Sequence, residues 1–373
     1  MLTTGFQRMR SYIRQGLSRL HSYSTRLRNR QVEPWNETQE SKRAEREEVV
    51  AVCFPIRCIK VQGILSGDGK YGDLMEMIEV FQDNGDFKSH DSLVQFLIHS
   101  YEEKEKFSMV WVLKIEEAAT YSYQGNWEHA KKLLELVINS DLPVEHWRVI
   151  KARACYLLVA HMRRNQEYSK SNIDLLFEYL KRSVHLLHKY DLPGDWAELY
   201  QTYGCVWMDR MNQLPFDERN SARENAVDCF HRAIYYSEQT SRKRVQMKRQ
   251  SYVHLKFAMI HLGCCSTFPL AQENHCPLND IKEAKRHLGI IKSKFGKTIP
   301  KATKMLLSKT KSDLCYRLGK FQLAKKKAEE AHKCALDNGF NTELKTLQER
   351  KDFYQKKRAT RFRGFIKGQE SGK

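Results

Sequence analysis

The residues best suited to chemistry are cysteines and histidines, and four of them share one short stretch. Cys264, Cys265, His275 and Cys276 combine thiol and imidazole groups, which are ligands that zinc prefers. Their spacing differs from that of common zinc sites, because adjacent cysteines rarely both bind one tetrahedral ion. We therefore expect unliganded loop residues here, and we predict no metal site and no cofactor.

Two pairs of histidines also fall within helical patterns. His185 and His188 lie on one predicted helix, and His254 and His261 lie on another. Pairs at such spacings share a helix face and can bind a metal ion, but no third ligand is evident for either pair. Exposed or hydrogen-bonded histidines are the simpler interpretation.

No motif of a catalytic site is present. The stretch Ser66-Gly67-Asp68-Gly69-Lys70 lacks the preceding spacing of a phosphate-binding P-loop. The HExxH signature of metalloproteases and the GxSxG signature of serine hydrolases are both missing from the sequence. The sequence therefore predicts a protein that is not an enzyme.

The helices that carry these residues are most clearly patterned between Trp111 and Pro143. Ala118 and Tyr121 mark the packed face of a first helix, and Gly125-Asn126 forms a turn. A second helix follows, and Pro143 ends it. Trp127, Ala130, Leu134 and Val137 lie at helical spacings along that second helix. This segment resembles a tetratricopeptide repeat, a helix–turn–helix unit of about 34 residues.

Weaker copies of the unit follow along the chain, and the resemblance covers roughly residues 111–340. The clearest copies are residues 111–143, 195–238 and 305–340. Small or aromatic residues recur at the positions where two helices would cross: Gly204, Ala226, Phe230, Ala233, Ala284, Gly319, Phe321, Ala324 and Ala331. Because one helix pair cannot bury its apolar face alone, we expect the pairs to stack. The predicted fold is all-α, a right-handed superhelical solenoid of stacked tetratricopeptide-like pairs.

Four segments make up the predicted domain organisation. Residues 1–32 are a basic amphipathic segment, 33–48 a charged linker, 49–357 the helical repeat domain and 358–373 a basic tail. Residues 1–32 contain seven arginines and no acid, a composition typical of a mitochondrial presequence and also of a solvated basic tail. We expect a cytoplasmic protein, with the mitochondrial matrix as the alternative.

Composition excludes several other classes. Hydrophobic residues make up 41% of the chain and charged residues 29%, as in globular proteins. No apolar run reaches the ~18–20 residues that a membrane-spanning helix needs, so we expect no transmembrane segment. The chain has ten cysteines, most of them in helical patterns, and no secretory signal, which predicts reduced thiols inside the cell.

Charge is the most informative feature for function. The chain carries a net charge of +19, and residues 239–373 hold 32 basic and 11 acidic side chains. In tetratricopeptide folds the first helices line a concave groove, and a basic groove suits an acidic protein segment. The residues predicted to bind this partner are Arg242, Arg244, Lys248, Arg249, Tyr252, Lys256, Lys304, Lys309, Tyr316 and Arg317.

The sequence therefore predicts a non-catalytic adaptor or scaffold that binds an acidic partner through its C-terminal half. The alternative is RNA binding by the same surface, with Tyr252 and Tyr316 stacking on bases. The ligand, the oligomeric state and the exact register of the repeats stay open.

Overall fold

The computed structural model describes residues 69–141, 146–165, 170–215, 218–264, 276–296 and 299–370. The predicted presequence-like segment, the linker, residues 49–62 and the residues Cys265 and His275 lie outside this part of the chain. All described residues belong to one compact unit, Val61–Lys373. Within them every regular element is a helix, which confirms the predicted all-α class.

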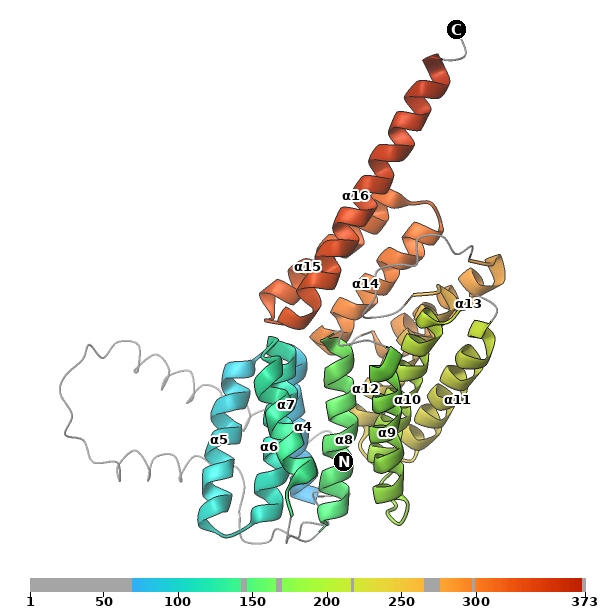
Figure 1. Cartoon of the computed structure of the whole chain (residues 1–373). Coiled ribbons are helices and arrows are strands. Elements are labelled where there is room, and N and C mark those ends of the chain that lie inside the picture. The colour runs from blue at the N-terminus through green and yellow to red at the C-terminus, as the bar shows by residue number, and fades with distance from the viewer. Residues whose placement is uncertain are drawn as a thin grey trace, which may run out of the picture. The chain divides into compact units, whose positions relative to one another are not determined.

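The helices follow one another in antiparallel pairs, as the sequence pattern predicts (Figure 1). In chain order the pairs are α4 (Gly69–Asn84) with α5 (Phe87–Glu103), α6 (Phe107–Gln124) with α7 (Trp127–Asn139), α8 (Trp147–Arg164) with α9 (Lys170–Leu187), α10 (Pro193–Gln213) with α11 (Arg219–Glu238), α12 (Lys243–His261) with α13 (Leu278–Ile290), and α14 (Lys301–Arg317) with α15 (Phe321–Asp337). The π-helix η3 (Ile291–Phe295) extends α13, and α16 (Asn341–Glu370) follows α15. This neighbour-to-neighbour packing is that of a helical repeat.

Local sequence explains where these helices start and stop. Gly125 ends α6 with φ of 82°, a left-handed conformation that glycine adopts without steric penalty. Asp86 caps α5, because its side chain accepts a hydrogen bond from the Ser89 amide. Pro193 is the first residue of α10, where its missing amide proton is not needed.

The residues expected at the helix crossings are mostly buried. Ala118, Ala130, Ala226, Phe230, Ala233, Ala284, Ala324 and Ala331 are each at most 1% exposed. Gly204 is a close approach, because a Cβ added there would lie 2.6 Å from the ring of Phe230. Tyr121 packs edge-on against His129. The ring of Trp127 packs against His161, and that of Phe321 against Tyr316, each at a tilted angle. Small residues thus let first and second helices approach while large residues fill the space beside them.

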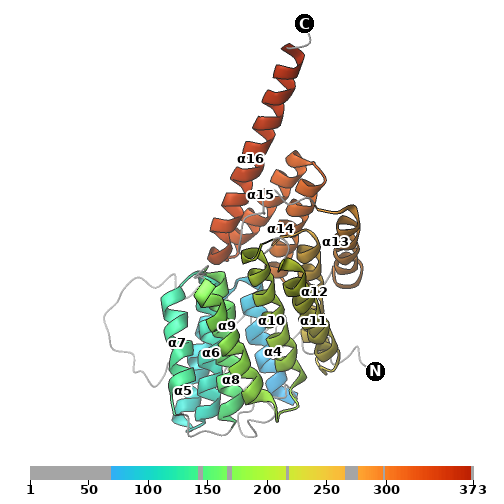
Figure 2. The ribbon, with the colours of Figure 1, turned by 45° about the vertical axis from the view of Figure 1, so that its right-hand side comes forward.

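The first helices of the pairs form a chain of contacts that returns to its start. α4 packs on α6, α6 on α8, α8 on α10, α10 on α12, α12 on α14, and α14 packs again on α4. A second link joins α16 to α6. At this junction Thr342 donates a hydrogen bond to the Ser122 carbonyl, and Asn341 donates one to the Gln124 carbonyl. Residues more than 200 positions apart therefore share one packed region, which Figure 2 shows from a second side.

One turn at this junction requires glycine for two reasons. Gly85, between α4 and α5, has φ of 72°, and a Cβ there would lie 2.1 Å from the Asn338 carbonyl oxygen. Phe87, Phe340, Ala331, Ala335 and Leu347 form a small apolar cluster beside it. The first and last helix pairs are consequently in direct contact.

The last helix is longer than expected. The sequence pattern predicted a helix ending near Lys357 and a basic tail from residue 358, but α16 continues to Glu370. Its second half holds no proline, so every residue there can donate its amide to the helix, although Gly364 and Gly368 are weak helix formers.

Candidate functional site

The basic residues expected in the groove lie largely on α12, and acids of other helices reach them. Lys248 Nζ lies 3.4 Å from Glu79 Oε2 and 3.0 Å from Asp83 Oδ1, both carboxylates of α4. Arg249 Nη2 donates to Glu198 Oε2 of α10 at 2.8 Å. The positive charge of α12 is therefore neutralised within the protein at these two positions.

The pKa values around α12 follow from this pairing. Burial alone would raise the pKa of Glu79, but Lys248 and then Arg249 hold it below its usual range. The pKa of Lys248 is raised in turn, since the charges of Asp83 and Glu79 outweigh its burial. Both shifts favour the ion pair.

Burial raises the pKa of Asp83 in spite of Lys248, and Glu116 of α6 is a second carboxyl with a raised pKa. Burial raises its pKa to about 7, and the nearby charges of Glu79 and Glu198 add to the rise. Gln82 of α4 donates a hydrogen bond to Glu116 Oε2 at 3.3 Å. This carboxyl gains a proton near neutral pH rather than near pH 4.5.

Ion pairs also join α8 to α10. Arg153 holds Asp195 in a bidentate pair, with Nε to Oδ1 at 2.6 Å and Nη2 to Oδ2 at 2.8 Å. Tyr156 donates a further hydrogen bond to Asp195 at 3.0 Å. Arg163 pairs with Asp209 about three turns further along α8 and about four turns further along α10. Adjacent first helices are thus tied by buried charge pairs as well as by apolar packing.

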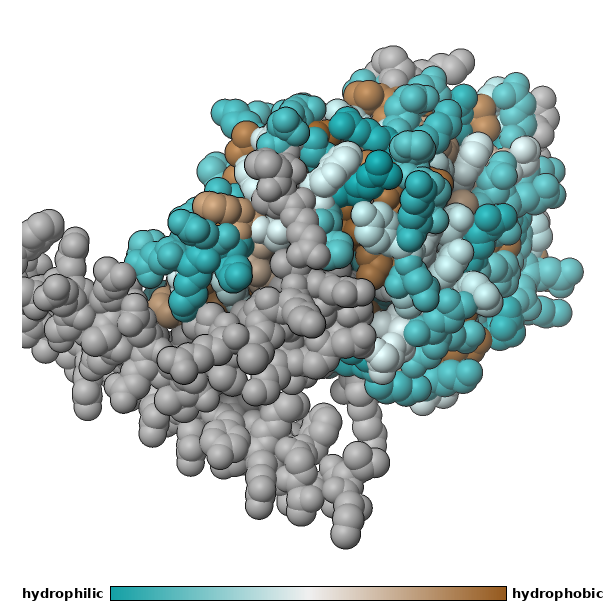
Figure 3. All heavy atoms as spheres, turned by 90° about the horizontal axis from the view of Figure 1, so that it is seen from below, coloured by the Kyte–Doolittle hydropathy of each residue, from teal (hydrophilic) through white to brown (hydrophobic). Residues whose placement is uncertain are grey.

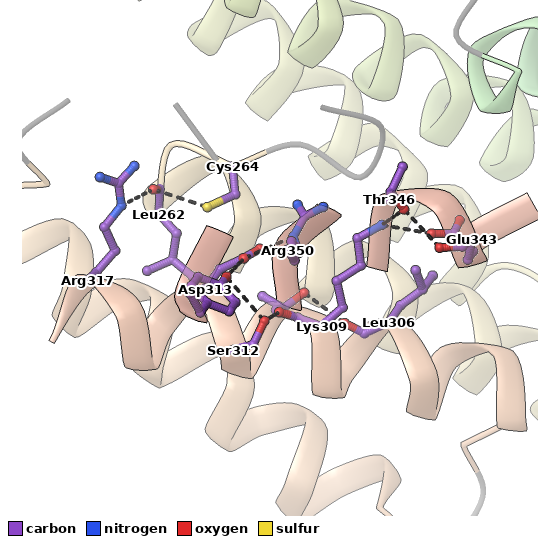
Figure 4. A network of polar contacts seen from close by, with 12 residues as sticks. Leu262, Cys264, Leu306, Lys309, Ser312, Asp313, Arg317, Glu343, Thr346 and Arg350 are labelled. Atoms are coloured by element: carbon purple, nitrogen blue, oxygen red, sulfur yellow. Dashed lines mark hydrogen bonds and ion pairs between the residues drawn. The ribbon is translucent and has the colours of Figure 1, made fainter. Parts of the chain in front are cut away.

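Buried ion pairs also join α14 to α16, as Figure 4 shows. Lys309 Nζ donates to Glu343 Oε2 at 2.7 Å and to Thr346 Oγ1 at 3.3 Å. The charge of Lys309 lowers the pKa of Glu343 even though burial opposes this. Lys309 is fully buried, so its ammonium group is enclosed by these partners.

A second pair of the α14–α16 network lies one turn further along. Arg350 Nε donates to Asp313 Oδ1 at 3.1 Å, and the Tyr354 hydroxyl donates to the same oxygen at 2.6 Å. At the end of α14, Arg317 Nε donates to the Leu262 carbonyl at 3.0 Å (Figure 4). These contacts fix α16 and the end of α12 on α14.

The predicted partner-binding residues therefore differ in their exposure to solvent: some are buried, and others are partly or fully exposed. Lys256 and Lys309 are buried, which is not the exposed position expected for them. Tyr252 contacts Lys256, with 4.7 Å between the ammonium nitrogen and the ring centre. Tyr316 packs among Phe321, Phe353 and Tyr354. Lys304 is exposed, and Arg242, Arg244, Lys248, Arg249, Tyr252, Tyr316 and Arg317 are partly exposed.

Lysines that the sequence interpretation did not select gather on another face. Lys292 of η3, Lys311 of α14, and Lys320 and Lys327 near the start of α15 form what we call the lysine face. Burial lowers the pKa of Lys311, and the charges of Lys327 and Lys292 lower it further. Cys315 lies among them: burial raises its pKa, against the opposing effect of Lys320, Lys327 and Lys311. Lys292 and Lys327 thus lie close enough to act on Lys311, and Lys320, Lys327 and Lys311 lie close enough to act on Cys315.

Acidic side chains compensate only part of this face. Lys327 bonds to both carboxylate oxygens of Glu330, at 2.9 and 2.7 Å. Lys292 and Lys320 are exposed, and Lys311 is partly exposed. The lysine face therefore carries more positive than negative charge toward solvent.

Histidines of α12 and α13 form a separate cluster. His261 of α12 lies with Glu283 and His287 of α13, and one ligand-capable atom from each falls within 4.8 Å of the others. The sequence pattern paired His261 with His254 and found no third ligand. The i, i+4 spacing of Glu283 and His287 on one helix was the available signal. Of the cysteine-rich loop, Cys264 is buried, and Cys276 donates to the His261 carbonyl.

The surface seen in Figure 3 carries no large apolar area among its coloured residues; hydrophilic side chains dominate and apolar ones form small groups. Exposed large apolar side chains lie on several helices, among them Leu136 of α7, Tyr235 of α11 and Leu278 of α13. Within the described residues, no helix is long and apolar enough to cross a membrane.

A comparison with models of known protein families finds no match, and a comparison with curated proteins finds none either. The function is therefore inferred from the fold and from the geometry of the site.

Proposed function

We propose that this protein is a non-catalytic scaffold of tetratricopeptide-like helix pairs that binds an acidic protein segment through the lysine face. The proposal keeps the partner class that the charge distribution predicts. It moves the contact from the inner groove to the surface formed by η3, α14 and α15.

The first support is the internal pairing of the groove residues. Lys248, Arg249 and Lys309 each contact a carboxylate of another helix within 3.5 Å. A partner that bound them would have to replace these contacts, and for the fully buried Lys309 the loss of its ion pair costs about 3–5 kcal/mol. On the lysine face the Lys327–Glu330 pair is partly exposed, and pairs of this kind are worth at most about 1 kcal/mol, so an acidic segment can replace it at little cost.

The observation that carries the proposal is the convergence of Lys292, Lys311, Lys320 and Lys327. The charges of Lys327 and Lys292 add to the effect of burial in lowering the pKa of Lys311, and an anionic partner relieves this repulsion. Lysines present compact charges on flexible stems, which suits carboxylates at variable positions along a peptide.

The test is a binding titration of the full chain with a fluorescein-labelled polyglutamate peptide. The substitutions Lys311→Glu, Lys320→Glu and Lys327→Glu together should weaken binding at least tenfold. The matched control carries Lys104→Glu, Lys132→Glu and Lys189→Glu, which change the net charge equally at positions in α7 and just after α5 and α9. Equal losses in both variants would show that net charge alone, and not this face, attracts the peptide.

Single-stranded RNA is the second probe in the same experiment. Tyr252 and Tyr316, the aromatic residues expected to stack on bases, already contact Lys256 and an aromatic cluster. We therefore expect weaker binding of RNA than of the peptide at the same ionic strength. RNA binding that is tighter and falls steeply with salt would favour the RNA-binding alternative.

Two further properties belong to this proposal. The stacked pairs are proposed to follow the right-handed superhelical path of tetratricopeptide folds, and the protein is proposed to work in the cytoplasm. Fusing residues 1–32 to a fluorescent protein tests the location, since a mitochondrial signal would replace the cytoplasmic proposal.

A further inference from the structure

We propose that His261, Glu283 and His287 form a binding site for a divalent transition-metal ion, with Zn²⁺ as the best-suited ion. The proposal is independent of the proposed scaffold function. Two imidazoles and one carboxylate are a ligand set that zinc uses, with water in the fourth position.

The geometry of the three residues supports a single ion. Their ligand atoms lie within 4.8 Å of one another. Around tetrahedral zinc with bonds of about 2.0–2.1 Å, ligand atoms are about 3.3 Å apart. Rotation of the side chains by small amounts closes that difference, and Glu283 is exposed enough to move.

The surroundings of His261 prepare it to bind through the correct nitrogen. Its Nδ1 lies 2.7 Å from Asp280 Oδ1 and 3.1 Å from Arg223 Nη2, and we assign the proton to Nδ1 because the shorter contact is to a carboxylate, which accepts. The lone pair is then on Nε2. A carboxylate behind a ligating histidine is the usual second layer of zinc sites, where it fixes the tautomer and raises the basicity of the imidazole.

Arg223 completes this second layer. Its Nη2 donates to the same Asp280 oxygen at 2.6 Å, which holds the carboxylate in place. Asp280 itself is therefore a positioning residue, and the ligands are His261, Glu283 and His287.

His287 is held in place by a second histidine. It is buried, and its Nδ1 lies 3.0 Å from His254 Nδ1. Its Nε2 faces Arg286 instead and is the nitrogen that an ion would reach.

Arg286 is the competitor that the ion must displace. Its Nε donates to Glu283 Oε2 at 2.7 Å, and its Nη2 lies 3.1 Å from His287 Nε2. The guanidinium of Arg286 thus contacts two of the three proposed ligands, Glu283 and His287. The Arg286 side chain is 55% exposed, so it can turn into solvent when an ion arrives. Its removal should consequently strengthen metal binding.

The experiment is a titration of the full, EDTA-treated chain with Co²⁺ followed by visible absorption, and then displacement by Zn²⁺ followed by calorimetry. We expect one equivalent of Co²⁺ with visible bands of nitrogen and oxygen ligation. The same additions should raise the midpoint of thermal unfolding, because the ion joins α12 to α13.

Three variants make the assignment specific. Glu283→Gln should weaken Zn²⁺ binding at least tenfold, and since Glu283 lies at the surface the variant should fold normally. Arg286→Ala should strengthen binding several-fold, an effect that a purely structural role of this residue does not produce. The matched control is Glu103→Gln, which alters the exposed His99–Glu103 pair at the same i, i+4 spacing without a third ligand beside it.

Three results would overturn the proposal. The first is the absence of saturable Co²⁺ binding by the wild-type chain. The second is unchanged affinity in both Glu283→Gln and Arg286→Ala. The third is a strong thiolate-to-cobalt charge-transfer band, which would place the ion on cysteines such as Cys264 and Cys276 instead.

Discussion

Removing the Asp313 carboxylate should destabilise the protein strongly, because it leaves a buried guanidinium without its main counter-charge. Asp313 and Arg350 are 0% and 1% exposed. Burial alone would lower the pKa of Arg350, but the charge of Asp313 and its hydrogen bond raise it above the ordinary value. The two groups therefore depend on each other.

The magnitude follows from that dependence. Breaking a buried ion pair by removing one partner costs about 3–5 kcal/mol, so Asp313→Ala should lower the free energy of unfolding by about this amount. Replacing both partners with apolar residues often costs little. The double variant Asp313→Leu with Arg350→Met should therefore be at least about 2 kcal/mol more stable than Asp313→Ala.

Urea unfolding followed by circular dichroism measures these free energies. The control is Asp352→Ala, an exposed acid on the same helix as Arg350, with an expected change within about 0.5 kcal/mol. The reasoning fails if Asp313→Ala costs less than about 1 kcal/mol. It also fails if the double variant is no more stable than Asp313→Ala.

Two further predictions concern the junction and the inner face. Gly85→Ala should destabilise the protein by more than the ~1–2 kcal/mol of a left-handed alanine, because its Cβ would also meet the Asn338 carbonyl. Gly289→Ala is the control, because the space around Gly289 is open. In the same urea experiment it should be neutral or stabilising. The raised pKa of Glu116 means that the native state holds a proton that the unfolded chain loses. Stability should therefore fall as pH rises from about 4.5 to about 7, and Glu116→Gln should flatten that fall; an unchanged pH profile in the variant would count against the assignment.

The helix pairs were accessible to sequence reasoning because their signals are local. Apolar spacing, small residues at crossings and glycine turns all act within one unit, so Gly125, Gly204 and Gly319 indicated pairs that the structure contains. The contact between the first and last pairs was not accessible. It depends on Gly85 meeting Asn338 and on Thr342 meeting Ser122, and no local pattern reveals contacts over such separations.

The state of the basic residues was hidden for the same reason. The excess of basic residues in the C-terminal half can be counted from the sequence. Their acidic partners cannot be recognised in this way, because they lie far away along the chain. Lys248 and Glu79 are 169 residues apart, and Lys309 and Glu343 belong to different helices. The same limit applied to the histidines: His261 was noted, whereas Glu283 and His287 come from a helix beyond the loop.

The central claim is that the inner cations are enclosed and that the free positive charge lies outward. Brief acetylation of the folded chain with an N-hydroxysuccinimide ester, followed by mass spectrometry of each lysine, tests it most directly. We predict that Lys256 and Lys309 stay unmodified while Lys292, Lys304 and Lys320 react quickly, and that urea removes the difference. Modification of Lys309 at the rate of Lys304 in the folded protein would contradict the account.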